Sequence, residues 1–288
     1  MSTQFLSELK SLISEQIVLI EMRQHKLHIP KACDLYTKKG KWHFHSTAEI
    51  FIQVSGKSCM QTINGQTICS KKEMMIIPKG ISHYEEICHG SVDFRNIVIA
   101  FGRKTISIHS AIKREGNLPQ INELQQFVSE NVPDIVRYLE SVILWNNSSS
   151  ALYNTAARNL LLTVFSLILN NIEDPVRYQR QESRKVNQCR RLVSEHLANQ
   201  QLSVIWLANI IKCTPDYLSH IFHMETNSKL SVYINDKRVE FAKELLLESI
   251  LNIAEISYTC GYRDPGYMTR QFRKRCGESP RSYRNGMS

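Results

Sequence analysis

Residues 214–235 read TPDYLSHIFHMETNSKLSVYIN, and residues 264–285 read DPGYMTRQFRKRCGESPRSYRN. The two stretches align without a gap. Proline, phenylalanine and tyrosine recur at matching places, as Pro215 and Pro265, Phe222 and Phe272, and Tyr233 and Tyr283. Self-similarity at a fixed offset indicates copies of one supersecondary unit. The sequence therefore predicts two successive copies of the same small fold near the end of the chain.

Each copy carries the residues that start a helix. Thr214 and Asp264 are good N-cap residues, and each is followed by a proline at the first helical position. A short helix is expected upstream of each, at 203–211 and at 253–260. A helix, a tight turn and a capped second helix form a helix-turn-helix. The two predicted units span about 203–225 and about 253–275, and a continuous helix over 231–249 is expected to join them.

Positive charge is concentrated in the same region. The chain of 288 residues has 36 Lys and Arg against 27 Asp and Glu, a net charge of +9 at pH 7. Residues 183–288 hold 16 of the basic and 10 of the acidic residues, which accounts for +6 of that surplus. A surplus of this size favours a polyanion as partner.

The outward faces of the two capped helices are the candidate DNA-binding surface, because residues early on such a helix reach base edges in the major groove. The candidates on the first unit are Asp216, Ser219, His220 and His223. The candidates on the second unit are Gly266, Thr269, Arg270, Arg273 and Lys274. A solvated basic helix face is the alternative for one unit alone. Two units on a stiff connecting helix favour double-stranded DNA.

Residues 186–286 resemble the DNA-binding domain of the AraC/XylS family of bacterial transcription regulators. The resemblance lies in YLSHIFHMETNSK, RVEFAKELLLES, IAEISYTCGY and YMTRQFRKRCGESPRSYRN. It implies two helix-turn-helix units within 184–288, promoter DNA and RNA polymerase as partners, and a cytoplasmic, nucleoid-associated protein that is most often an activator. Lys212 and Asn227 stand where the family usually has glycine, and Pro265 and Gly266 stand where base-reaching polar side chains often lie.

The first third of the chain has the pattern of β structure. Seven of the 11 glycines lie at or before Gly116, and short apolar runs alternate with turn residues over 36–102. Asn64-Gly65 is a typical two-residue hairpin turn. Several short strands at this spacing predict a sandwich or a small barrel. We therefore expect an α+β, multidomain chain, with an N-terminal extension and a barrel within 1–115.

A cluster of possible metal ligands lies in this β-rich region. His43, His45, Glu49 and Gly56 follow the pattern H-x-H-x3-E-x6-G, and His83 ends the pattern P-x-G-x-x-H. These patterns resemble the two motifs of cupin barrels, in which the three histidines and the glutamate can ligate one divalent transition metal. Three imidazoles and a carboxylate suit Fe, Mn, Ni, Cu or Zn. Pocket lining without a metal, and a site for a small effector, are the alternatives.

Residues 116–173 are predicted to be helical. Ile121, Leu124 and Phe127 are spaced as on one helical face, and a second pattern begins at Pro133. Residues 151–172 are apolar almost all round, which predicts a subunit interface and a homodimer, unless the barrel covers the extra face. The interdomain linker is placed at 174–183.

Several function classes are disfavoured. None of the eight cysteines forms a C-x-x-C pair, and the sequence contains no phosphate-binding glycine loop, G-x-S-x-G or H-E-x-x-H. The most apolar run, over 160–169, is too short to cross a bilayer, so no membrane is expected. We expect a transcription regulator that is not an enzyme. The alternative is a cupin metalloenzyme of the dioxygenase or isomerase type with an accessory DNA-binding domain.

Overall fold

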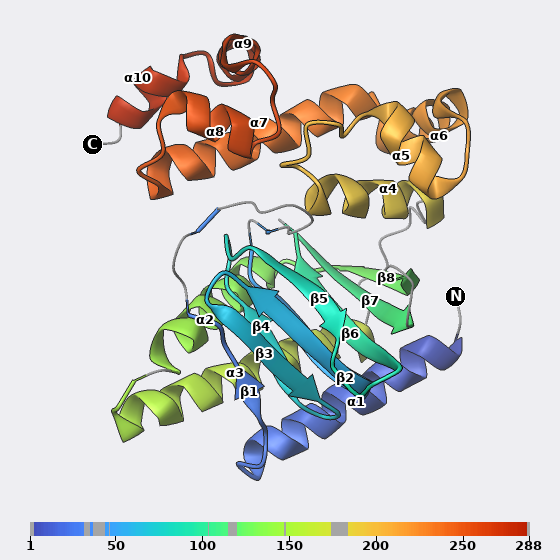
Figure 1. The fold of residues 1–288 in the computed structure, drawn as a ribbon, viewed down its shortest axis with the longest axis vertical. Helices are drawn as coiled ribbons and strands as arrows, with labels where there is room; N and C mark the ends of the chain where they lie inside the picture. The colour runs from blue at the N-terminus through green and yellow to red at the C-terminus, as the bar shows by residue number, and fades with distance from the viewer. Residues whose placement is uncertain are drawn as a thin grey trace. The chain divides into compact units, whose positions relative to one another are not determined.

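The chain folds into two compact units, Met1–Tyr178 and Gln179–Ser288. The computed structural model describes residues 3–31, 35–36, 44–45, 47–102, 104–114, 120–146, 148–173 and 184–286 (Figure 1). The predicted linker at 174–183 lies outside the described residues.

In its described residues the first unit combines three helices with strands that are antiparallel except for the β1–β4 pair. In chain order its elements are α1 (Thr3–Glu21), β1 (Leu27–His28), β2 (Glu49–Thr62), β3 (Gly65–Ser70), β4 (Met74–Ile77), β5 (His83–Ile87), β6 (Asp93–Phe101), β7 (Thr105–Arg114), β8 (Gln120–Val128), α2 (Val132–Trp145) and α3 (Ala151–Glu173). The strand order is β1-β4-β2-β6-β7-β8, with β3 and β5 paired to β2. The described strands leave the sheet open between β1 and β8, so the predicted closed barrel is not confirmed.

The long strand β2 belongs to two sheets. Its first half pairs with β4 and β6, and its second half pairs with β3 and β5. The change occurs near Gly56, whose φ is +64° and whose added Cβ would lie 2.2 Å from the carbonyl oxygen of Asp93. Only glycine fits this corner, which explains its place in the N-terminal motif. The hairpin at Asn64-Gly65 is confirmed, with Thr62 opposite Gly65.

The helices of the first unit cover one face of the sheet (Figure 1). Phe5, Leu9 and Ile13 of α1 are buried there. The other face packs against the β2–β3–β5 part of the fold through a separate apolar cluster: Phe51, Met60, Cys69, Met75, Ile77, Ile81, Val98 and Ala111.

The helix predicted around 121–128 is wrong, because Gln120–Val128 forms strand β8. β8 pairs with β7, with Asn122 opposite Ser110 and Leu124 opposite His109. Glu123 is an extra residue between these pairs and has a φ of +52°. A bulge of this kind adds one residue to the strand. By register, positions 121 and 124 are therefore three apart on one side of the strand, which is also the spacing of a helical face. Phe127, opposite Ile106, falls on the other side.

Helix α3 is less apolar on its outside than its composition suggests. By length and composition alone this helix of 23 residues could cross a membrane. Its most apolar run, over 160–169, has only ten residues and could not do so by itself. In the fold it packs against α1 and α2, and Leu161, Phe165 and Ile168 are buried in the core of the unit. Beyond Thr155 its exposed stripe is polar and includes Asn159, Thr163, Ser166 and Asn170, whereas Leu152 and Tyr153 in its first turn are exposed. The expected surplus apolar face therefore does not run along the whole helix and is confined to its first turn.

The second unit is entirely helical in its described residues. Its elements are α4 (Arg184–Glu195), α5 (Val204–Ile211), α6 (Pro215–Thr226), α7 (Leu230–Glu248), α8 (Ile253–Thr259), α9 (Pro265–Cys276) and α10 (Pro280–Asn285). Helix α7 runs between two groups, α4 to α6 at one end and α8 to α10 at the other (Figure 1).

The sequence repeat is also present in the packing. The rings of Phe222 and Tyr233 lie 5.2 Å apart, and those of Phe272 and Tyr283 lie 5.4 Å apart. Both phenylalanines are fully buried. The predicted caps are confirmed as well, because the side chains of Thr214 and Asp264 accept hydrogen bonds from backbone N–H groups in the first turns of α6 and α9.

Candidate nucleic-acid interface and the His45 cluster

Helix α6 presents a polar face to solvent. Asp216, His220 and His223 are exposed on it. Ser219 is half-buried, and its hydroxyl donates to the carbonyl oxygen of Pro215 at 2.8 Å. Three of the four predicted side chains on this helix are thus fully presented, while Ser219 retains only the acceptor capacity of its oxygen.

Helix α9 presents a more basic face. Arg270, Arg273 and Lys274 are exposed, whereas Thr269 is half-buried and donates its hydroxyl to the carbonyl oxygen of Pro265 at 2.9 Å. Thr269 and Ser219 therefore make the same bond at matching positions of the repeat. The local positive charge of α9 comes from the three long, solvent-facing cations.

Arg270 lies over the first turn of α9. Its Nη2 is 3.6 Å from Oδ2 of Asp264, the N-cap residue, and its guanidinium lies 5.9 Å from the ring centre of Tyr267. A Cβ added at Gly266 would be 3.5 Å from Nη1 of Arg270. That distance is an ordinary contact, so the position of Arg270 does not itself require glycine at 266.

The face of α6 continues onto residues that the sequence did not single out. A hollow of about 420 Å³ is lined by Val204, Asp216, Ser219, His220, His223, Lys229, Leu230 and Ser231. Lys229 is exposed at the N-cap position of α7, where no side chain caps the helix. Unpaired N–H groups and a cation at a helix start attract anions. The sequence did not point to Lys229, because this residue precedes α7 and is not part of α6. Only the fold brings it beside the exposed face of α6.

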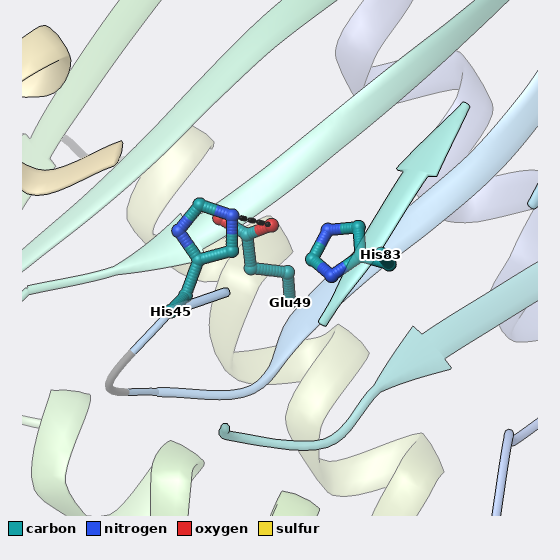
Figure 2. A group of neighbouring side chains, drawn as sticks. All are labelled: His45, Glu49 and His83. Carbon is teal, nitrogen blue, oxygen red and sulfur yellow. Dashed lines mark ion pairs between the residues drawn. The ribbon is translucent and has the colours of Figure 1, made fainter. Parts of the chain in front are cut away.

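The first unit contains a buried cluster of His45, Glu49 and His83. Figure 2 shows the three side chains facing one another. Nε2 of His45 lies 3.2 Å from Oε2 of Glu49, and the rings of His45 and His83 are 5.4 Å apart. One ligand atom from each residue lies within 4.8 Å of the others. His43 lies outside the described residues, and His45 precedes β2 rather than lying on it.

The chemistry of this cluster suits a cation. Nδ1 of His83 is bonded to the carbonyl oxygen of Ile81 at 2.8 Å, which fixes the ring and leaves Nε2 as the nitrogen able to ligate. Burial lowers the pKa of His83 to about 4, so the imidazole is neutral at pH 7. Neutral imidazole and carboxylate are ordinary ligands of divalent transition metals.

The second unit matches a known family. A family described as "Helix-turn-helix domain" matches residues 207–286. The chain is 24% identical to the arabinose operon regulatory protein of Salmonella typhimurium over 242 residues, which is 82% of each chain. It is also 24% identical to the HTH-type transcriptional activator RhaS of Klebsiella pneumoniae over 176 residues, 60% of each chain.

A solved structure is also similar to part of the chain. It is the C-terminal domain of AraT, a response regulator from Geobacillus stearothermophilus, with 30% identity. The match covers 37% of this chain and 88% of that domain, and the TM-score is 0.36.

Proposed function

Because the chain belongs to the AraC/XylS family of transcription regulators and has a helix-turn-helix DNA-binding domain, we propose that it reads promoter DNA with two helix-turn-helix units, α5–α6 and α8–α9. The observation that carries this proposal is the repeated, capped helix with an exposed polar face, found in α6 and again in α9. The chain is a regulator and not an enzyme, since the relatives that match it over 60% or more of its length are named as regulators or activators.

In this proposal α6 and α9 enter adjacent segments of the major groove, about one helical turn or ~10 bp apart. The base-reading candidates are the predicted residues of α6 and α9. Lys229, at the start of α7, is a candidate for a phosphate contact. Selection of duplexes from a random library by the full chain tests it. The expected product is a sequence with two conserved segments, and failure to enrich any sequence at low salt would contradict it.

Arg270→Ala should weaken binding to the selected duplex by about 1–3 kcal/mol, if Arg270 reads a guanine with two hydrogen bonds. The measurement is a titration of variant and wild type on the selected duplex and on a duplex of scrambled sequence. Arg137→Ala is the control, because it removes the same charge from the other unit. Equal weakening of Arg270→Ala on both duplexes would make Arg270 a phosphate contact and not a base reader.

Activation through RNA polymerase is proposed from the same relatives, one of which is named an activator. A regulator of promoters acts where the chromosome is, so we propose a cytoplasmic, nucleoid-associated location. The first unit would serve in effector sensing, in dimerisation or in both. Its cupin-like character is supported by the two-sheet arrangement around β2 and by the His45 cluster.

We also propose that His45, Glu49 and His83, with His43, can hold one divalent transition metal. Added metal should stabilise the metal-free chain against heat, by about 2.7 kcal/mol at 100 times the dissociation constant. Glu49→Gln should remove most of that gain while keeping the side-chain volume. His89→Ala changes an exposed histidine and should leave the gain intact. If none of Fe²⁺, Mn²⁺, Ni²⁺, Cu²⁺ and Zn²⁺ shifts the unfolding temperature, the cluster is packing alone.

A homodimer is the proposed assembly, and its support lies at the corner between α2 and α3. Leu144 and Leu152 are 74% and 82% exposed there, and Tyr153 stacks on Trp145. An exposed apolar patch of this kind marks an interaction site, and an identical subunit is the commonest partner. Two DNA-binding domains on one promoter would then gain affinity through effective concentration.

Sedimentation should show a dimer at micromolar concentration, and Leu152→Glu should give a folded monomer. Ile250→Glu is the matched control, because Ile250 is a fully exposed residue of the other unit. A wild type that sediments as a monomer with and without DNA would refute the dimer.

A further inference from the structure

The second unit contains two helix pairs, α5–α6 and α8–α9. One buried arginine contacts both the loop before the first pair and the turn within the second. Arg238 lies near the middle of α7 and is only 8% exposed. Its Nε donates to the carbonyl oxygen of Leu197 at 3.3 Å, and its Nη2 donates to that of Asn199 at 2.8 Å. Both carbonyls belong to the loop between α4 and α5, which leads into the first pair.

The same guanidinium contacts the second pair. It lies 5.4 Å from the ring centre of Tyr262, a buried residue in the turn between α8 and α9. The preceding residue, Gly261, has a φ of +80° and lies against the same loop. A Cβ added there would be 2.2 Å from the oxygen of Leu197 and 2.9 Å from Nη2 of Arg238. The loop before the first pair, the middle of α7 and the turn of the second pair are therefore in direct contact.

This contact explains why the two turns tolerate different residues. Lys212 occupies the turn of the first pair with a φ of +58° and is exposed, so its side chain meets no obstacle. Gly261 has the same left-handed backbone but faces a carbonyl oxygen. The second turn thus requires glycine for close approach as well as for its backbone angle.

A buried cation is a costly way to fill this space. Burial lowers the pKa of Arg238, because the charged form loses water. An apolar side chain of similar volume often stabilises a fold as well or better. The guanidinium instead fixes geometry. Its planar group donates hydrogen bonds to two carbonyls at fixed angles, and its face lies over the ring of Tyr262. Other contacts hold each pair to α7 separately, such as Asp236 with Arg275 in the second pair.

We propose that Arg238 is a positioning residue that fixes the distance and angle between the two helix pairs, so that α6 and α9 engage one operator as a rigid body. The proposal rests on the proposed function, since it concerns how the two helix-turn-helix units, α5–α6 and α8–α9, act together. It predicts that the length of DNA between the two recognised segments is strictly limited.

The first test uses the wild-type chain and duplexes selected from a random library. Inserting two base pairs between the recognised segments turns one segment by about 70° relative to the other. A rigid pair should then bind no better than to a duplex with one segment scrambled. Undiminished binding to the lengthened duplex would overturn the proposal. Failure to select any sequence would instead count against DNA reading itself, so the two failures are distinguishable.

The second test uses Arg238→Met, which keeps an unbranched apolar stem but loses the guanidinium and its donors. It should bind the complete duplex at least about tenfold more weakly, and each single-segment duplex within about twofold of wild type, because only the linkage is lost. Lys243→Met is the control. It removes the same charge from α7, and Lys243 lies over the ring of Tyr283 in α10, at the α8–α10 end of the unit.

Wild-type affinity of Arg238→Met for the complete duplex would overturn the proposal, and so would an equal loss on single segments. Circular dichroism establishes that the variant is folded. If it is not, Arg238→Lys is measured by the same criteria, since lysine keeps the charge but can bond only as a point donor.

Discussion

Binding of the full chain to duplex DNA should weaken by about a thousandfold between about 50 and about 200 mM salt. Exposed cations on the second unit are the reason: Lys212, Lys229, Arg263, Arg270, Arg273, Lys274 and Arg281. Each phosphate that a cation neutralises adds about −0.9 to the slope of log affinity against log salt. About six such contacts give a slope near −5. Titration by fluorescence anisotropy at several salt concentrations measures it.

The charge-removing variant Lys229→Ala should make that slope less steep by about one on every sequence, because a phosphate contact carries no sequence information. Lys31→Ala is the matched control, an exposed lysine of the first unit. An affinity for DNA that does not change with salt would contradict the proposed interface.

Phe272→Ala should destabilise the second unit by about 3–5 kcal/mol, and Phe222→Ala should do the same. Each ring is fully buried and contacts the tyrosine of its own copy, so truncation leaves a cavity in the core of that helix pair. A loss of this size is a large share of the stability of a small domain. Urea unfolding followed by circular dichroism measures it.

Met224→Ala is the control, because Met224 lies on the same helix as Phe222 and is exposed. It should change the free energy of unfolding by less than about 0.5 kcal/mol. Wild-type stability in either phenylalanine variant would mean that the inner and outer faces of α6 and α9 have been assigned the wrong way round. The proposed DNA-binding residues would then be wrong as well.

The second unit was readable from sequence because its signals are local. An N-cap followed by proline marks the starts of α6 and α9, and the repeat identifies Phe222 and Phe272 as matching core positions. The role of Arg238 could not be read in the same way. Its partners are the carbonyls of Leu197 and Asn199, about forty positions away, and backbone carbonyls leave no trace in a sequence.

The first unit was harder to predict because long-range pairing decides it. The bulge at Glu123 puts positions 121 and 124 three apart on one side of β8, which is also helical spacing, and only the pairing with β7 reveals the strand. Residues 151–172 show an apolar composition, yet composition does not say that α1 and α2 cover the helix and leave Thr163 and Ser166 outside. The motif identified His45, Glu49 and His83 as neighbours, and the fold adds that His45 precedes strand β2, which begins at Glu49.

The central claim is that α6 and α9 read one stretch of DNA together. A hydroxyl-radical footprint of the full chain on its selected duplex tests it most directly. The account predicts two protected segments on the same side of the duplex, with centres about 10 bp apart. Protection of one segment alone, or of two segments whose separation varies from one duplex to another, would contradict it.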